Sequence, residues 1–83
     1  HMGWNKILDT KNRIFNKIDN DHRFYFAHSY YIECDMKENV IGTTLYGEKF
    51  ESVIQNNNVI GVQFHPEKSY KDGERIFKNF FKL

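Results

Sequence analysis

Three consecutive asparagines at positions 56–58 divide two runs of residues that favour β-structure. Asparagine tolerates the left-handed backbone that a tight turn requires, so this tract predicts the tip of an antiparallel hairpin. The strand before the tip is expected over residues 50–54 and the returning strand over residues 59–64. Alternate side chains of a strand share a face, which places three apolar residues of the returning strand together: Ile60, Val62 and Phe64.

A helix is predicted after this hairpin, over residues 69–83. Ser69 with Asp72 resembles a capping box at its start, and Glu74 with Lys78 forms a stabilising pair one turn apart. The large apolar residues of the segment recur at helical spacing and are expected to pack against the sheet as one stripe: Ile76, Phe77, Phe80 and Phe81.

Two further strands are predicted upstream of the hairpin. Residues 23–32 are rich in aromatic and β-favouring residues, as in strands covered on both faces, and residues 40–46 form a second run of this kind. Several strands followed by one closing helix indicate an α+β or α/β sheet with a helix on one face. Gly73 lies early in the helix, where a small residue would let the helix approach the sheet closely.

Composition limits the size and the class of the protein. The chain has 83 residues, which form one domain at most and bury a marginal core. Aromatic residues make up 17% of it, a large apolar surface for so small a body, which suggests a piece of something larger. The net charge of +1 indicates neither a nucleic-acid nor a membrane protein, and no apolar run is long enough to span a bilayer. The single cysteine, Cys34, excludes an internal disulfide and fits a reducing, cytoplasmic setting.

The strongest candidates for chemistry are His65 and Glu67, at the end of the returning strand. Pro66 between them favours extended geometry at residue 65, and residues two apart in an extended chain point to the same side. A carboxylate on one ring nitrogen fixes the histidine tautomer and leaves the other nitrogen free to take a proton from a nucleophile. The pair is two thirds of a Cys-His-Glu or Ser-His-Glu triad. Taken alone, three residues more often form a turn with a solvated carboxylate, and a metal site would need further ligands from His22 and His28.

The surrounding residues narrow these alternatives. Residues 61–69, GVQFHPEKS, resemble the signature that completes the triad in class I glutamine amidotransferases. Three more strings resemble the glutaminase subunits of imidazole glycerol phosphate synthases within that family: HMGWN at 1–5, FYFAHSYY at 24–31 and GTTLYG at 42–47. The resemblance covers nearly the whole chain. It implies an α/β fold in which residues 1–83 are the C-terminal segment of one flavodoxin-like domain, contributing several later strands and the last helix.

The resemblance also implies a reaction. A cysteine thiolate would attack the side-chain amide of glutamine, with His65 activating the cysteine and protonating the departing ammonia. Glu67 would orient His65. The products would be glutamate and ammonia, and the ammonia would pass to a (β/α)8-barrel cyclase subunit that builds an imidazole ring in histidine biosynthesis. No cofactor and no metal are implied.

Four other residues acquire roles only by position in the family pattern. Ser29 and Tyr30 would help to hold the glutamine backbone through main-chain groups. Trp4 and Tyr25 would lie near the subunit contact where ammonia leaves. Without the resemblance, each of these aromatic residues is more simply explained as part of a packed core.

The nucleophile is the one expected part that the sequence does not contain. The family places it in a Gly-x-Cys-x-Gly turn, in the N-terminal half of the domain, and no such string occurs here. Cys34 lies between Glu33 and Asp35, two acidic neighbours that disfavour a thiolate. The 83-residue chain is therefore expected to be catalytically silent by itself.

Two alternative functions and one physical consequence remain open. A paralogous glutaminase could feed ammonia to an enzyme that aminates a surface sugar. A small aromatic-rich module could stack single-stranded nucleic acid, although the near-neutral charge argues against it. A chain separated from half of its sheet exposes strand edges, so it is expected to self-associate.

Overall fold

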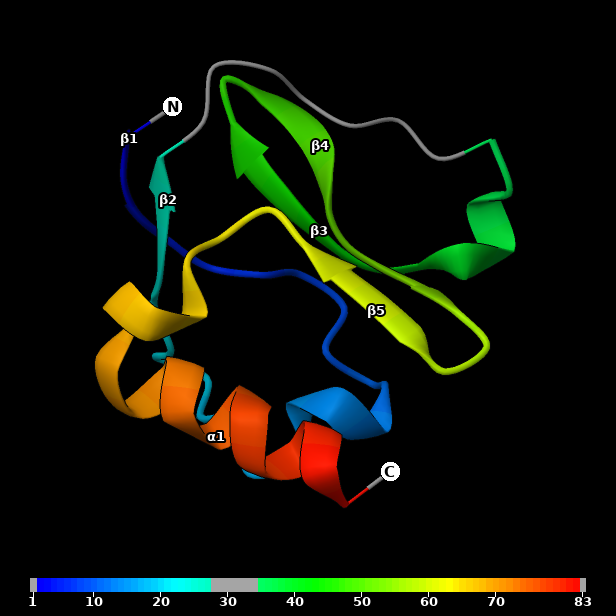
Figure 1. Cartoon of the computed structure of the whole chain (residues 1–83). Helices are drawn as coiled ribbons and strands as arrows, with labels where there is room; N and C mark the ends of the chain where they lie inside the picture. The colour runs from blue at the N-terminus through cyan, green and yellow to red at the C-terminus, as the bar shows by residue number, and fades with distance from the viewer. Residues whose placement is uncertain (1, 28–34, 83) are drawn as a thin grey trace.

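The computed structural model describes residues 2–27 and 35–82. Figure 1 shows their strands, short 3₁₀ helices and single α-helix. The strands are β1 (Met2–Asn5), β2 (Phe24–Ala27), β3 (Val40–Tyr46), β4 (Glu48–Asn56) and β5 (Val59–Val62). The helices are η1 (Arg13–Phe15), η2 (Lys37–Asn39), η3 (Pro66–Lys68) and α1 (Tyr70–Phe81). Several strands and a final helix are the arrangement expected from the sequence.

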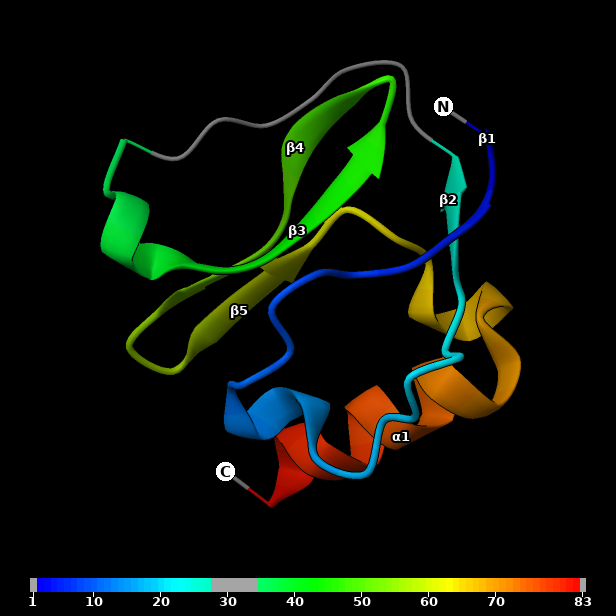
Figure 2. The same cartoon turned by 180° about the vertical axis from the view of Figure 1, so that it is seen from behind.

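The strands form two antiparallel sheets. In one sheet β1 pairs with β2, and in the other the order is β3-β4-β5. Two single-residue bridges join the sheets, one between Leu8 and Thr43 and one between Phe26 and Phe64. Seen from either side, α1 and η1 lie next to each other, at the opposite end of the molecule from the turn between β3 and β4 (Figures 1 and 2).

The predicted hairpin is confirmed. β4 and β5 pair in antiparallel register around the asparagine tract, and Asn57 has the left-handed backbone, with φ of 57°, that the turn requires. The strand expected at residues 40–46 is β3, with the same bounds. β5 ends at Val62 rather than at residue 64, because Phe64 leaves the β4 ladder and bridges to β2 instead.

The strand expected at residues 23–32 is confirmed as β2 over its described part, and residues 28–32 lie outside the described residues. Phe24 and Phe26 point from β2 into the core and are fully buried. Phe24 packs on Phe64 with ring centroids 4.3 Å apart, and Phe26 meets the Phe50 ring edge-on at 5.6 Å. The core is completed by other buried apolar side chains: Ile7, Ile14, Phe15, Val53 and Ile76.

His22 belongs to this buried region. Its Nε2 accepts the Ile7 N–H at 3.0 Å, and its Nδ1 lies 2.6 Å from the Asp19 carbonyl oxygen. The acceptor role of Nε2 places the ring proton on Nδ1, which donates to that carbonyl. Both ring nitrogens therefore serve the fold, so His22 is a core histidine rather than a free metal ligand.

The prediction that the phenylalanine stripe of α1 packs against the sheet is wrong. Phe77, Phe80 and Phe81 are 47%, 42% and 80% exposed. The buried face of the helix instead contains Asp72, Gly73, Ile76 and Asn79. The reason is hydrogen bonding, since Asn79 Nδ2 donates to two main-chain carbonyls of the η1 region, those of Ile14 and Asn16, each at 2.7 Å. The Glu74–Lys78 pair on the exposed side is present at 3.3 Å, as expected.

No helix among residues 2–27 and 35–82 is long and apolar enough to cross a membrane.

Candidate functional site

The segment that follows β5 presents the two residues singled out by the sequence. Phe64 is buried, His65 is extended with φ of −97° and ψ of 100°, and Pro66 then begins η3. The extended backbone at His65 is what the following proline was expected to impose. Because side chains alternate in extended chain, burial of Phe64 turns His65 outward.

His65 and Glu67 lie side by side, as predicted. His65 Nδ1 is 3.0 Å from Glu67 Oε2. An ionised carboxylate can only accept, so the proton of this contact is on Nδ1 and Nε2 is the basic nitrogen. The two side chains are 37% and 61% exposed, so the pair lies at the surface where another molecule or segment can reach it.

The local bonding favours the ionised form of Glu67. A hydrogen bond from its own backbone N–H is the largest cause, and the hydrogen bond with His65 is the second, and together they lower the pKa of Glu67 below its ordinary value. The carboxylate is consequently ionised at neutral pH. It can hold the Nδ1 proton and stabilise an imidazolium at His65.

Aromatic residues surround this pair on one side. The Tyr25 ring lies 6.3 Å from the His65 ring, and Lys68 Nζ lies 6.0 Å from the Tyr25 centroid. Trp4 meets Tyr25 edge-on at 5.5 Å, which brings together the two residues predicted at a subunit contact. Trp4 also stacks on Tyr70 at 5.7 Å with 13° between the ring planes.

Tyr70 is a site neighbour that sequence reasoning missed. It is 78% exposed and has a left-handed backbone with φ of 51°, which is unusual for a bulky residue. The sequence feature that could have indicated Tyr70 is its position as an aromatic residue directly after the GVQFHPEKS string. Ser29 and Tyr30, the predicted glutamine-binding residues, lie outside the described residues, as does Cys34.

The predicted capping box at the start of α1 is wrong. Ser69 occupies the N-cap position, but its hydroxyl makes no capping bond. It accepts the Tyr25 N–H at 3.0 Å and donates to the His65 carbonyl at 2.7 Å. Asp72 Oδ2 accepts the Arg23 N–H at 2.9 Å. The Ser69 side chain therefore bonds to β2 and to His65, and the Asp72 side chain bonds to the residue just before β2, rather than capping the helix.

Gly73 allows a close approach, although its neighbour is η3 and not a sheet as expected. A Cβ at this position would lie 1.9 Å from the Pro66 carbonyl oxygen, a distance that no side chain tolerates. The absence of a side chain lets the first turn of α1 rest directly on the turn that carries His65 and Glu67.

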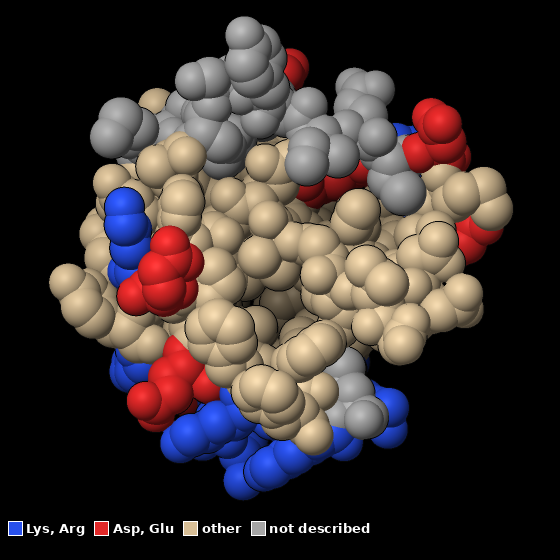
Figure 3. Space-filling view, in the orientation of Figure 1, with Lys and Arg blue, Asp and Glu red and all other residues tan. Residues whose placement is uncertain are grey.

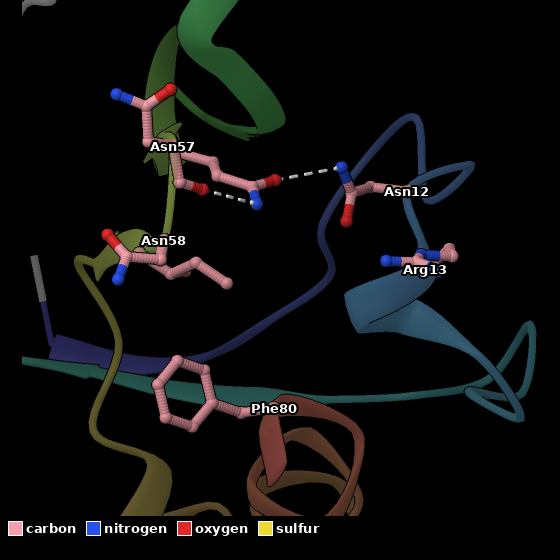
Figure 4. A pocket seen from close by; sticks show the side chains of 7 residues that line it. Asn12, Arg13, Asn57, Asn58 and Phe80 are labelled. Carbon is pink, nitrogen blue, oxygen red and sulfur yellow. Dashed lines mark hydrogen bonds between the residues drawn. The ribbon is translucent and has the colours of Figure 1, made fainter. Parts of the chain in front are cut away.

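A separate cavity of about 580 Å³ lies away from the pair. Figure 3 shows the face of the molecule seen in Figure 1, where a largely uncharged surface has a central hollow and Lys and Arg side chains gather along the lower edge. Figure 4 shows Phe80 of α1 on one side of the cavity and the asparagines of the hairpin tip on the other. Its amides bond to one another, since Asn12 Nδ2 donates to Gln55 Oε1 at 3.2 Å and Gln55 Nε2 donates to the Asn57 carbonyl at 3.1 Å. Neither His65 nor Glu67 lines this cavity.

Comparison with known proteins adds a family to this geometry. The family described as "Glutamine amidotransferase class-I" matches residues 1–83. Among curated proteins, the chain is 46% identical over 83 residues to "Imidazole glycerol phosphate synthase subunit HisH 2" of Methanococcus maripaludis, covering 99% of this chain and 41% of that protein. It is 50% identical over 84 residues to "Imidazole glycerol phosphate synthase subunit HisH" of Blochmanniella floridana, covering 100% and 42%. The like-named protein of Sulfurimonas denitrificans is 43% identical over 82 residues, covering 99% and 40%. The chain thus spans about two fifths of the length of these relatives.

Proposed function

Because this chain belongs to the class-I glutamine amidotransferase family, we propose that it supplies the histidine and the glutamate of a glutaminase triad. The observation that carries the proposal is the contact of 3.0 Å between His65 Nδ1 and Glu67 Oε2, within the string that resembles the family signature. The whole enzyme would hydrolyse glutamine to glutamate and deliver the ammonia to a synthase. The names of the relatives support imidazole glycerol phosphate synthase, in histidine biosynthesis, as the assembly that it serves.

The orientation of the pair suits acid–base work on a cysteine. Nε2 of His65 is the basic nitrogen, and it would take the thiol proton as the sulfur attacks the amide carbon of glutamine. The same proton would then pass to the departing nitrogen, which leaves as ammonia, and a glutamyl thioester would remain. Water activated by Nε2 would cleave the thioester and release glutamate. Through these steps Glu67 would hold the Nδ1 proton and favour the imidazolium.

Four further residues are proposed to serve the glutamine and the partner subunit. Ser29 and Tyr30 are proposed to hold the glutamine backbone through main-chain groups. The aromatic pair of exposed Trp4 and half-buried Tyr25, with Lys68 beside it, is proposed to face a (β/α)8-barrel cyclase subunit. Tryptophan and tyrosine are suited to such contacts because they bury much apolar area while keeping a polar group.

The 83-residue chain alone is proposed to have no glutaminase activity, since the Gly-x-Cys-x-Gly string that would carry the nucleophile is not in its sequence. Cys34 does not replace it, because two acidic residues flank it and no glycine does. In a cell, the site is proposed to act in the cytoplasm, where cysteine thiols stay reduced.

The test uses the enzyme in which this chain is joined to the nucleophile-bearing part of the domain. His65→Asn is expected to abolish glutamine hydrolysis, while added ammonia still supports the synthase reaction. Glu67→Gln should lower kcat by a smaller factor, and Glu74→Gln, on the exposed side of α1, should match the wild type. Persistent glutamine-dependent synthesis in the His65→Asn enzyme would overturn the proposal.

The identity of the synthase is tested separately. Glutamine hydrolysis by the wild-type enzyme is measured with the imidazole-forming cyclase and, in parallel, with a sugar-aminating enzyme. Hydrolysis is expected to rise only with the cyclase. A rise with the sugar-aminating enzyme alone would assign the chain to a paralogous glutaminase.

A further inference from the structure

We propose that Ser69 is a positioning residue, whose hydroxyl fixes the main chain of His65 to β2. This inference rests on the proposed function, because it concerns the histidine of that site. Ser69 is 2% exposed, so its hydroxyl is closed to solvent and bonds within the protein. The hydroxyl donates to the His65 carbonyl at 2.7 Å and accepts the Tyr25 N–H at 3.0 Å.

With one further bond, these two hydrogen bonds link both main-chain polar groups of His65 to Tyr25. The N–H of His65 donates directly to the Tyr25 carbonyl at 2.8 Å. Its carbonyl is tied to the N–H of the same tyrosine through the Ser69 hydroxyl. Both main-chain polar groups of His65 are thus linked to Tyr25 of β2, and the carbonyl also accepts the Lys68 N–H at 3.1 Å. These bonds leave the peptide planes on either side of His65 little freedom to rotate.

A hydroxyl is suited to this task because it can donate and accept at once. Alanine at position 69 would leave the Tyr25 N–H without its acceptor, and a thiol would bond weakly. The ordinary role of serine before a helix is to cap it, but the Ser69 side chain makes no capping bond here. Helix capping therefore does not account for its buried hydroxyl.

Two neighbouring contacts, made by Asp72 and Gly73, also hold the turn that carries His65 in place. Asp72 Oδ2 accepts the Arg23 N–H at 2.9 Å, which ties α1 to the residue just before β2. Gly73 lets α1 rest on the carbonyl of Pro66. The turn that carries His65 and Glu67 is consequently held between β2 and the first turn of α1.

The exposed pair needs such support. His65 and Glu67 are 37% and 61% exposed, and an exposed ion pair contributes little by itself because water competes for both charges. Burial does not hold these two side chains together. Their geometry depends on where the backbone places them, which is the role assigned to Ser69.

The first measurement is made by NMR on the 83-residue chain, with Ser69→Ala as the test variant. The matched control is Ser52→Ala, because Ser52 is equally buried and its hydroxyl makes no hydrogen bond to any described residue. In Ser69→Ala, exchange of the Tyr25 amide should accelerate by roughly fivefold relative to the global opening rate, as expected for one lost hydrogen bond. The pKa of Glu67 should rise towards its ordinary value, since its second-largest cause of lowering is the bond with His65. Both quantities should stay at wild-type values in Ser52→Ala.

Ser69→Thr tests whether the hydroxyl itself is responsible, because threonine restores it and alanine does not. Recovery of the lowered Glu67 pKa in Ser69→Thr would support the positioning role. A lowered Glu67 pKa and a slow Tyr25 amide in Ser69→Ala would overturn it, and so would equal effects in Ser52→Ala.

The enzyme that contains the nucleophile separates this inference from the proposed function. There, Ser69→Ala should lower kcat for glutamine hydrolysis by roughly fivefold or more, on the scale of one hydrogen bond, with KM unchanged. If His65→Asn abolishes hydrolysis but Ser69→Ala behaves as wild type, the inference about Ser69 fails and the function stands. If the NMR results hold but His65→Asn retains hydrolysis, the proposed function fails and the role of Ser69 in the fold remains.

Discussion

The two faces of α1 differ in a way that reverses the usual pattern of a surface helix. The inner face places Asp72, Gly73 and Asn79 against the rest of the protein, with Ile76 as its buried apolar residue. The outer face exposes three phenylalanines: Phe77, Phe80 and Phe81. Amphipathic helices normally bury their apolar side.

Directional contacts, together with burial of Ile76, hold α1 against the rest of the protein. Hydrogen bonds to main-chain groups fix both ends of the inner face, to the residue just before β2 at the N-terminal end and to the η1 region at the C-terminal end. Among the described residues, the outer aromatic face stays exposed.

Gly73→Ala should have the largest effect on the inner face. The added Cβ would lie 1.9 Å from the Pro66 carbonyl oxygen, so α1 has to move away from η3. We expect a loss of roughly 3 kcal/mol in the free energy of unfolding, at the upper end for overpacking. Urea unfolding measures it. Gly61→Ala is the control, with its Cβ 3.3 Å from the flexible Ile54 side chain and an expected loss below about 1 kcal/mol. Equal losses in the two variants would remove the case for close docking.

Asn79→Asp tests the other end of the inner face. The amide nitrogen that donates to the Ile14 and Asn16 carbonyls would be replaced by a carboxylate oxygen, which cannot donate. We expect a loss of roughly 2 kcal/mol, because one buried and one partly buried carbonyl lose their donor and face a negative charge. Thermal unfolding is the measurement, with Lys71→Ala as a surface control. A variant as stable as the wild type would mean that Asn79 does not anchor α1.

The double variant Phe77→Lys and Phe81→Lys examines the outer face. Both side chains are exposed, so the free energy of unfolding should change by no more than about 0.5 kcal/mol for each substitution. Self-association should fall, because the exposed aromatic surface is a candidate for contact between copies. Light scattering over a concentration series distinguishes oligomers in the wild type from monomers in the variant. Monodisperse wild-type monomers at high concentration would contradict the expected self-association.

Acid titration of Glu67 should change the stability of the chain least among these tests. It reports on the contact between Glu67 and His65, which lies on the turn held by the inner face of α1. The pKa of Glu67 in the folded chain is lowered, so the stability that its carboxylate contributes is complete above the ordinary, unfolded pKa. That contribution is lost as the pH falls through the lowered, folded value. Carbon-13 NMR of the Glu67 carboxyl should show the lowered midpoint, and the contact with His65 should be lost with it. A midpoint at the ordinary value would mean that the pair is not formed in solution.

Local rules predicted the parts of this protein that depend on neighbours in sequence. The asparagine tract gave the correct hairpin because turn chemistry is set within four residues, and Pro66 gave the correct extended geometry at His65. The same rules failed at Ser69, whose partner lies 44 residues away in β2, and at Asp72, whose partner lies 49 residues away just before β2. A capping motif cannot reveal that a distant strand offers a free N–H at the same place.

The buried face of α1 was mispredicted for a related reason. Periodicity shows which side of a helix is apolar, but not which side the rest of the chain occupies. Here Asn79 and Gly73 decided the orientation, one by two donated hydrogen bonds and one by the space it leaves. The roles of Ser29 and Tyr30 remain predictions.

The bridge between Phe26 and Phe64 fixes which residues of this extended segment point into the core and which point to solvent. A shift of one residue in the register with β2 would expose Phe64 to solvent and bury the His65 imidazole in the hydrophobic core. The tight packing of Phe64 on Phe24 penalises that error, since no smaller or polar group could fill the same space. The packing of Phe64 on one side of the backbone thus keeps His65 on the opposite, solvent-facing side.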